Sequence, residues 1–174
     1  MDSLGLDRLV EVQALEGLLT ALAQGLRSQR WRLVTAESCT GGLVAAACTS
    51  IAGSSDWFER GYVTYSNEAK TESLGVPAEL IERHGAVSRE VAMAMVMGAL
   101  QRSGAQVGVA TTGIAGPGGG SPRKPVGTVW FAWARAQDFV EAECRHFPGD
   151  RTRVRAAATR HALQRVRSLL EATA

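Results

Sequence analysis

The stretch from Trp31 to Cys48 constrains the fold more than any other part of this chain. Residues 31–35 form an apolar run typical of a buried strand, and the small apolar residues 43–48 are typical of a helix. Ser38 lies where the strand turns into the helix, with Gly41 and Gly42 just behind it. Backbone N–H groups without partners converge at a helix N-terminus, where the helix dipole favours negative charge. A serine nucleophile and the oxyanion that it generates can both use such a place.

Strand and helix patterns alternate along the rest of the chain, and no linker rich in proline, serine or charge divides it. We therefore predict a single α/β domain over residues 1–174, a three-layer α/β/α sandwich with a central mixed sheet. A short polar turn joins the last two strands, so part of the sheet is expected to be antiparallel. The strand patterns cover residues 31–36, 61–65, 107–110, 126–134 and 141–147. The helix patterns cover residues 7–28, 41–50, a short segment from Pro77 to His84, a longer one capped by Ser88, and a last one from Asp150 to Leu170.

Composition excludes several classes of protein. With 174 residues, 45% hydrophobic and 21% charged, the chain is typical of a globular domain with a real core. No apolar stretch approaches the length that spans a bilayer, and the N-terminus lacks a signal-peptide pattern, so the expected location is the cytoplasm without a membrane partner. A net charge of only +2 argues against a protein that coats nucleic acid. Neither a disulfide framework nor a metal site is expected from three scattered cysteines and three scattered histidines.

Ser38 has two readings on the residues alone. Serine is a frequent helix N-cap, which needs no catalytic role. The surroundings match neither the Gly-x-Ser-x-Gly pattern of α/β-hydrolases nor a Ser-x-x-Lys pattern. Cys39 is a rival nucleophile, because a helix N-terminus can lower the pKa of a thiol, although no histidine is evidently placed to serve as its base.

Tyr65 and Lys70 flank a segment that closes a predicted strand and enters a turn or short helix. A neutral lysine can act as a base for serine, but lowering its pKa from about 10.4 to near 7 requires roughly 4–5 kcal/mol from the environment. A solvated lysine after a packed tyrosine is the alternative reading.

The glycine-rich loop of residues 113–120 follows the strand at 107–110. It is not a phosphate loop of the Walker type, yet glycines at the end of a strand let the backbone approach an anionic ligand closely. A flexible surface loop is the alternative, and Arg123 and Lys124 just beyond it could meet a phosphate or only water. The arginines of the last helix suggest a solvated face, a nucleic-acid surface or, for Arg151 at its start, a side chain that points into a cleft.

Together these segments resemble the C-terminal domain of the competence/damage-inducible CinA proteins, a family that also occurs as a stand-alone amidase. The resemblance covers about residues 10–170. It rests on several motifs in the same order, which are residues 35–42, 51–55, 61–67 with Lys70, 85–88, 112–119, 125–129 and 147–151.

The resemblance implies hydrolysis of the carboxamide of nicotinamide mononucleotide, which gives nicotinic acid mononucleotide and ammonia without a metal or organic cofactor. It implies Ser38 as the nucleophile, Lys70 as its base and Tyr65 as a partner in proton transfer or orientation. The oxyanion is expected near the backbone N–H groups of residues 39–42. The residues implied to bind the substrate are Cys39, Thr40, Gly41, Gly42, Asn67, Thr112, Gly113, Gly116 and Arg151.

Two other functions remain open at this point. One is a non-catalytic nucleotide-binding module, and the other is a DNA-associated accessory protein, which the family's naming and the arginine-rich last helix suggest. The apolar faces of the first and last helices also predict a homo-oligomer.

Overall fold

A mixed five-stranded sheet forms the centre of the computed structural model, which describes residues 3–136 and 139–172, with side chains from Leu15 onward. The strand order is β2-β1-β3-β4-β5. Strand β1 runs parallel to both β2 and β3, whereas β3, β4 and β5 are antiparallel to one another. The strands are β1 (Leu33–Glu37), β2 (Phe58–Val63), β3 (Val107–Gly113), β4 (Thr128–Arg135) and β5 (Phe139–His146). The predicted mixed sheet is therefore confirmed.

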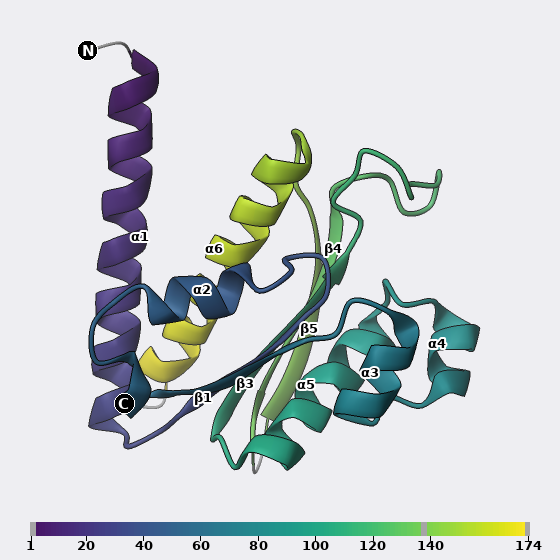
Figure 1. Cartoon of the computed structure of the whole chain (residues 1–174), viewed down its shortest axis with the longest axis horizontal. Coiled ribbons are helices and arrows are strands. Elements are labelled where there is room, and N and C mark those ends of the chain that lie inside the picture. Colours follow the sequence, from purple (N-terminus) through teal and green to yellow (C-terminus); the bar gives the residue numbers. More distant parts are fainter. Residues whose placement is uncertain (1–2, 137–138, 173–174) are drawn as a thin grey trace.

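Helices cover both faces of this sheet (Figure 1). On one side lie α1 (Ser3–Ser28), α2 (Leu43–Thr49) and α6 (Arg151–Glu171), and on the other lie α3 (Asn67–Leu74), α4 (Ala78–His84) and α5 (Arg89–Ser103). A short 3-10 turn, η1 (Ser54–Asp56), precedes β2. The predicted three-layer α/β/α arrangement is confirmed.

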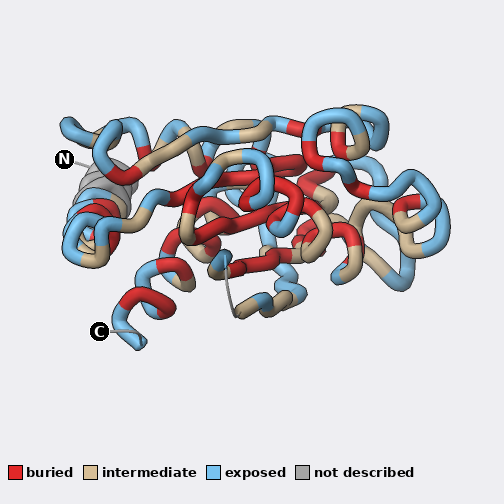
Figure 2. The backbone as a smooth tube through the Cα atoms, turned by 90° about the horizontal axis from the view of Figure 1, so that it is seen from below, coloured by how far each residue is buried: buried red, intermediate tan, exposed pale blue. Residues whose placement is uncertain are grey.

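Strand β4 shows how the sequence builds two cores, because its side chains alternate between the two faces of the sheet. Val129, Phe131 and Trp133 pack in the core under α1 and α6. Ala132 and Ala134 pack on the opposite face with α5, where small side chains let the helix lie close. Buried residues accordingly gather in the middle of the molecule, and exposed ones lie at its periphery (Figure 2).

Several predicted boundaries differ from the observed ones. Helix α1 begins at Ser3 rather than at Asp7, and the side chains of Asp7 and Val12 lie outside the described residues. Strand β2 covers 58–63 rather than 61–65, because it is an edge strand whose exposed positions accept charged residues. The caps were predicted correctly: Ser88 accepts from the backbone N–H of residue 91, and Asp150 from that of residue 153.

The parallel part of the sheet determines where a site can form. Strands β1, β2 and β3 end at the same edge, so Glu37, Val63 and Gly113 open onto a common region. In open α/β sheets, ligands bind at the carboxyl ends of the strands. The segments that follow these three strands include Ser38, Lys70 and the glycine-rich loop.

Candidate active site

Ser38 lies in the turn that leaves β1. Its N–H donates to the carbonyl of Thr111 on β3 at 2.9 Å, and its carbonyl accepts from the N–H of Gly41 at 3.0 Å. Gly41 and Gly42 have φ values of +59° and +91°, in the left-handed region that favours glycine. These two glycines therefore allow the sharp turn that presents the serine, which is 9% exposed.

The side chain of Glu37 holds the turn that contains Ser38 in place, a role that was not predicted from the sequence. Its carboxylate, 1% exposed, accepts hydrogen bonds from the backbone N–H groups of Gly42, Val44 and Ala45 at 2.8–3.0 Å. It also accepts from the hydroxyl of Thr40 at 2.7 Å. A carboxylate bound by the first N–H groups of a helix stabilises that helix end. Glu37 thus caps α2 and holds the serine turn against it.

The Glu37 carboxylate changes which amides face a substrate. The N–H of Gly42 donates to Glu37 and that of Gly41 to the carbonyl of Ser38. Of the four amides expected near the oxyanion, those of Cys39 and Thr40 make no hydrogen bond to an oxygen within the described residues, and they lie toward the Cys39 sulfur. The amides of Gly41 and Gly42, which were expected near the oxyanion, are thus already used within the turn.

Lys70 lies in the first turn of α3 and reaches back to the serine. Its Nζ is 3.2 Å from the Ser38 hydroxyl oxygen, within hydrogen-bond distance. It also donates to the carbonyls of Thr64, Tyr65 and Ser66 at 2.9–3.3 Å. Ser66 caps α3 by accepting from the backbone N–H of residue 69, and this cap sets the direction of the helix that carries the lysine.

Burial lowers the pKa of Lys70 from its ordinary 10.5, because the side chain is 1% exposed and removal from water disfavours the ammonium form. The acidic groups of Cys39 and Glu68 act in the opposite direction, to a smaller extent. A lysine base requires such an environment, and the alternative of a solvated lysine is wrong.

Cys39 is poorly suited to be the nucleophile. Burial raises the pKa of its thiol to about 12, and the nearby charge of Glu37 adds to this effect. Backbone N–H groups lower the pKa by less than burial raises it. The thiol therefore stays protonated at neutral pH, in contrast to the lowered pKa that a helix N-terminus suggested.

Tyr65 and Arg151 form the outer part of the site. The Tyr65 side chain is 59% exposed, and its hydroxyl accepts a hydrogen bond from the guanidinium of Arg151 at 2.8 Å. The same guanidinium donates to the carbonyl of Gly116 at 2.9 Å. Tyr65 contacts Lys70 through its main-chain carbonyl, so its hydroxyl lies toward Arg151 rather than the lysine. Arg151 thereby links the β2–α3 connection, the glycine-rich loop and α6.

Arg155, one turn further along α6, is a second arginine at the site that the sequence analysis did not single out. Its guanidinium donates to the carbonyl of Thr40 at 2.8 Å and lies against Gly41. The Nε atom of Arg155 is buried and has no partner within the described residues. The hydroxyl of Thr40 meanwhile bonds that of Thr111 at 2.8 Å, which ties the serine turn to β3.

The predicted residues at the end of β3 and in the loop that follows it have mainly structural contacts. Thr112 is buried, and its hydroxyl donates to the carbonyl of Ala86. A side chain at Gly113 would meet the carbonyl of residue 128 at 2.7 Å, and one at Gly116 would meet Val126 at 2.6 Å. Lys124 donates to the carbonyls of residues 84 and 87 and so locks the loop to the α4–α5 connection.

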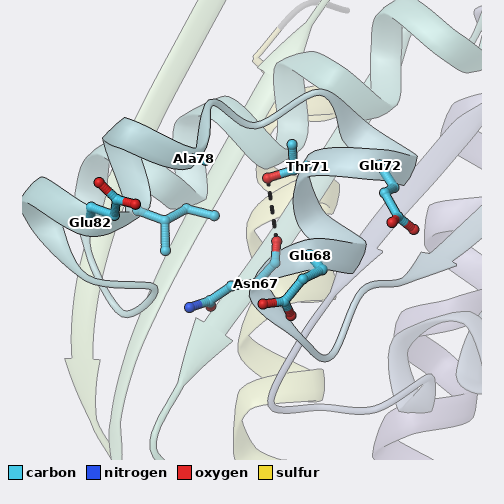
Figure 3. Close-up of a pocket in the computed structure, with 7 residues that line it drawn as sticks. Asn67, Glu68, Thr71, Glu72, Ala78 and Glu82 are labelled. Atoms are coloured by element: carbon cyan, nitrogen blue, oxygen red, sulfur yellow. Dashed lines mark hydrogen bonds between the residues drawn. The ribbon is translucent and has the colours of Figure 1, made fainter.

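Asn67 lies apart from the Ser38–Lys70 pair. It is exposed and lines a pocket of about 360 Å³ between α3 and α4 (Figure 3). Lys70 is buried and is not among the residues that line this pocket. The pocket residues are Asn67, Glu68, Thr71, Glu72, Ala78, Ile81 and Glu82.

Within the described ranges, no group of three or more histidine, cysteine or acidic side chains could hold a metal ion. Nor is any helix in that part of the chain both long enough and apolar enough to cross a membrane.

Comparisons with known proteins identify the family of this chain. The model of the CinA C-terminal domain matches residues 15–170. Nicotinamide-nucleotide amidohydrolase PncC of Escherichia coli K12 is 54% identical over 145 residues, which are 82% of this chain and 87% of that protein. The Pseudomonas putida protein of the same name is 56% identical over 138 residues, 79% of this chain and 86% of that one.

Solved structures show the same fold. A CinA superfamily protein from Klebsiella pneumoniae 700603 has a TM-score of 0.86 at 41% identity and covers 90% of this chain and 98% of its own. The competence/damage-inducible protein CihA of Agrobacterium tumefaciens has a TM-score of 0.86 at 46% identity, with coverage of 89% and 94%. The chain therefore belongs to the CinA C-terminal domain family.

Proposed function

We propose that this protein is an amidohydrolase that deamidates nicotinamide mononucleotide to nicotinic acid mononucleotide and ammonia, a reaction of pyridine nucleotide salvage. The names of relatives that are more than half identical over most of the chain support this activity. The observation in the structure that carries the proposal is the contact between Lys70 Nζ and the Ser38 hydroxyl at 3.2 Å, buried at the carboxyl edge of the sheet.

We further propose that Ser38 attacks the amide carbon while neutral Lys70 accepts the hydroxyl proton. A neutral amine has one lone pair for that proton and two N–H bonds, for which main-chain carbonyls such as that of Thr64 are the acceptors. The negative charge on the carbonyl oxygen is stabilised by the backbone amides of Cys39 and Thr40. Burial keeps Lys70 neutral at a lower pH than a solvated lysine, which suits it to this role.

Collapse of the tetrahedral intermediate breaks the carbon–nitrogen bond. Lys70 returns its proton to the leaving nitrogen, which departs as ammonia, and an ester joins the acyl group to Ser38. Water then attacks this ester, with Lys70 accepting a proton from the water and giving one back to the Ser38 oxygen. The products are the carboxylic acid and free serine, so each proton taken up in one half-reaction is returned in it.

The decisive experiment measures ammonia release from nicotinamide mononucleotide by the wild type, Ser38→Ala and Cys39→Ala. We expect turnover by the wild type and by Cys39→Ala, and none by Ser38→Ala, with all three proteins folded by circular dichroism. Turnover by Ser38→Ala but not by Cys39→Ala would show that the thiol of Cys39, and not the hydroxyl of Ser38, is the nucleophile. Binding of the mononucleotide by a folded wild type without ammonia release would favour a non-catalytic nucleotide-binding module instead.

A further inference from the structure

The two edges of the sheet differ in how they are protected against pairing with a further strand. An edge strand offers unpaired backbone groups, and proteins commonly protect it with charged side chains or bulges. Strand β5, at one edge, carries Glu141, Glu143 and Arg145 along its length. Strand β2, at the other edge, has Glu59, Arg60 and an irregular register with β1 in its first half. The second half of β2 has none of these features.

The second half of β2 is uncharged and open to solvent. Residues 61–65 are Gly, Tyr, Val, Thr and Tyr, and Val63 is 54% exposed. The backbone N–H of Thr64 donates to the carbonyl of Glu37 on β1. Because backbone groups alternate in direction along a parallel strand, those of Gly61 and Val63 face away from β1. They therefore point outward from the last strand of the sheet.

Helix α2 extends this uncharged surface. It contains no charged residue, and its exposed residues Leu43 and Ala46 are three positions apart and so lie on one side of the helix. A side chain at Gly42 would meet Cγ2 of Val63 at 3.5 Å, which places the start of α2 beside the end of β2. Exposed apolar residues that gather in one place are typical of an interaction surface.

The apolar faces of α1 and α6, from which a homo-oligomer was predicted, are used within the fold. Leu22 and Leu26 of α1 belong to the same core as Leu163 and Val166 of α6. These side chains stabilise the chain itself, so the edge at β2 is a separate surface from the one predicted.

A second copy of β2 fits this edge by symmetry. An antiparallel pair with its two-fold axis at Tyr62 places Gly61 of each copy opposite Val63 of the other. Both residues direct their backbone groups outward, so each such pair can exchange two N–H···O bonds. The exposed side chain of Val63 then lies beside a residue that has no side chain.

The charges of the strand are compatible with this register. Arg60 comes opposite Thr64 of the other copy, and Glu59 comes opposite Tyr65 of the other copy. Like charges directly opposite each other destabilise a sheet, and in this pairing none meet. An unrelated peptide would make such contacts once, whereas in a symmetric pair of identical strands every contact occurs twice.

We infer that the second half of β2 and the exposed side of α2 bind a second copy of this chain, so that the two sheets join into one across a two-fold axis at Tyr62. The surface borders the candidate active site, since the carbonyls of residues 64–66 contact Lys70. The inference does not depend on the proposed function, because the assembly is measured without substrate.

Sedimentation velocity over a range of protein concentrations tests the dimer. The proteins are the wild type, Val63→Lys and the control Val140→Lys, which makes the same change at an exposed valine on the β5 edge. We expect the wild type and the control to be dimers. The dissociation constant of Val63→Lys should rise at least about a hundredfold, roughly tenfold for each of the two lysines that symmetry introduces. A monomeric wild type, or Val63→Lys that dimerises like the wild type, would overturn the inference.

Directed cross-linking tests the register and stays decisive if Val63→Lys does not fold. The Cα atoms of a non-hydrogen-bonded antiparallel pair are about 4.5 Å apart, a distance that a disulfide can span. Both test proteins carry Cys144→Ser, which removes the exposed native thiol. With oxidised glutathione, Tyr62→Cys should give a disulfide-linked dimer, and Val140→Cys should remain largely monomeric on a non-reducing gel. Cross-linking of Tyr62→Cys no greater than that of Val140→Cys would contradict the two-fold pairing.

Discussion

Replacement of Glu37 by glutamine tests whether this buried carboxylate organises the serine turn. One carboxylate oxygen accepts from the backbone N–H of Ala45 at 2.8 Å, and the other from those of Gly42 and Val44 at 3.0 Å. A glutamine has one acceptor oxygen, and its NH₂ group must face donors on the other side. The least costly orientation places the NH₂ group toward Ala45 and leaves that single N–H without an acceptor.

The expected loss of stability follows from the number of backbone N–H groups that each substitution leaves without an acceptor. One unsatisfied buried N–H costs about 1–3 kcal/mol, so Glu37→Gln should lower the free energy of unfolding by about that amount. Glu37→Ala leaves all three N–H groups without the carboxylate and should cost about 3–6 kcal/mol.

Urea denaturation of both variants, beside the wild type, measures these losses. The control is Glu82→Gln, an exposed glutamate on α4 that makes the same chemical change and should shift the free energy by less than about 0.5 kcal/mol. If Glu37→Gln shifts the free energy no more than this control does, the reasoning that the carboxylate anchors the turn is refuted.

Three further predictions follow from the contacts around this site. Because neutral Lys70 is the proposed base and burial lowers its pKa below 10.5, kcat/KM should fall as the pH falls through that lowered pKa; a rate independent of pH across the neutral range would contradict this. Gly98→Ala should destabilise the protein by about 1–3 kcal/mol in thermal unfolding, because the added methyl group would overlap the carbonyl oxygen of Leu74 at the end of α3; an unchanged melting temperature would show that the helices can separate at no cost. Thr64→Val should raise the free energy of unfolding by about 0.5–1 kcal/mol, since the buried Thr64 hydroxyl has no partner in the described part of the chain; a loss of stability would reveal a partner for it.

Much of the fold was predictable from local patterns. The strands at the centre of the sheet, such as β4, are apolar on both faces and are recognised by composition alone. The helix starts at Ser88 and Asp150 follow from ordinary capping chemistry. The start of β2 was not predictable, because Glu59 and Arg60 belong to an exposed edge and resemble a loop in sequence.

Only the part of the site that belongs to sequence motifs could be predicted. The sequence marked Ser38 and Lys70, but which side chains hold them depends on contacts between distant segments. Glutamate is rarely fully buried, so nothing local marked Glu37 as an anchor. Arg155 belongs to a helix rich in arginine, and only its tertiary contact with Thr40 distinguishes it from its solvated neighbours. The amides of the turn were likewise reassigned only once the Glu37 hydrogen bonds were known.

The position of α6 also has a consequence for the order in which this site comes into being. Ser38 and Lys70 belong to the first half of the chain, whereas Arg151 and Arg155 follow every strand of the sheet. During synthesis the ribosome therefore releases the reactive pair long before the residues that close its outer edge. A nascent chain that ends after β3 already contains the serine and the lysine, but it lacks the helix that covers this end of the sheet. Such a chain would carry the reactive groups without the arginines that hold the glycine-rich loop and the serine turn, so these contacts form last.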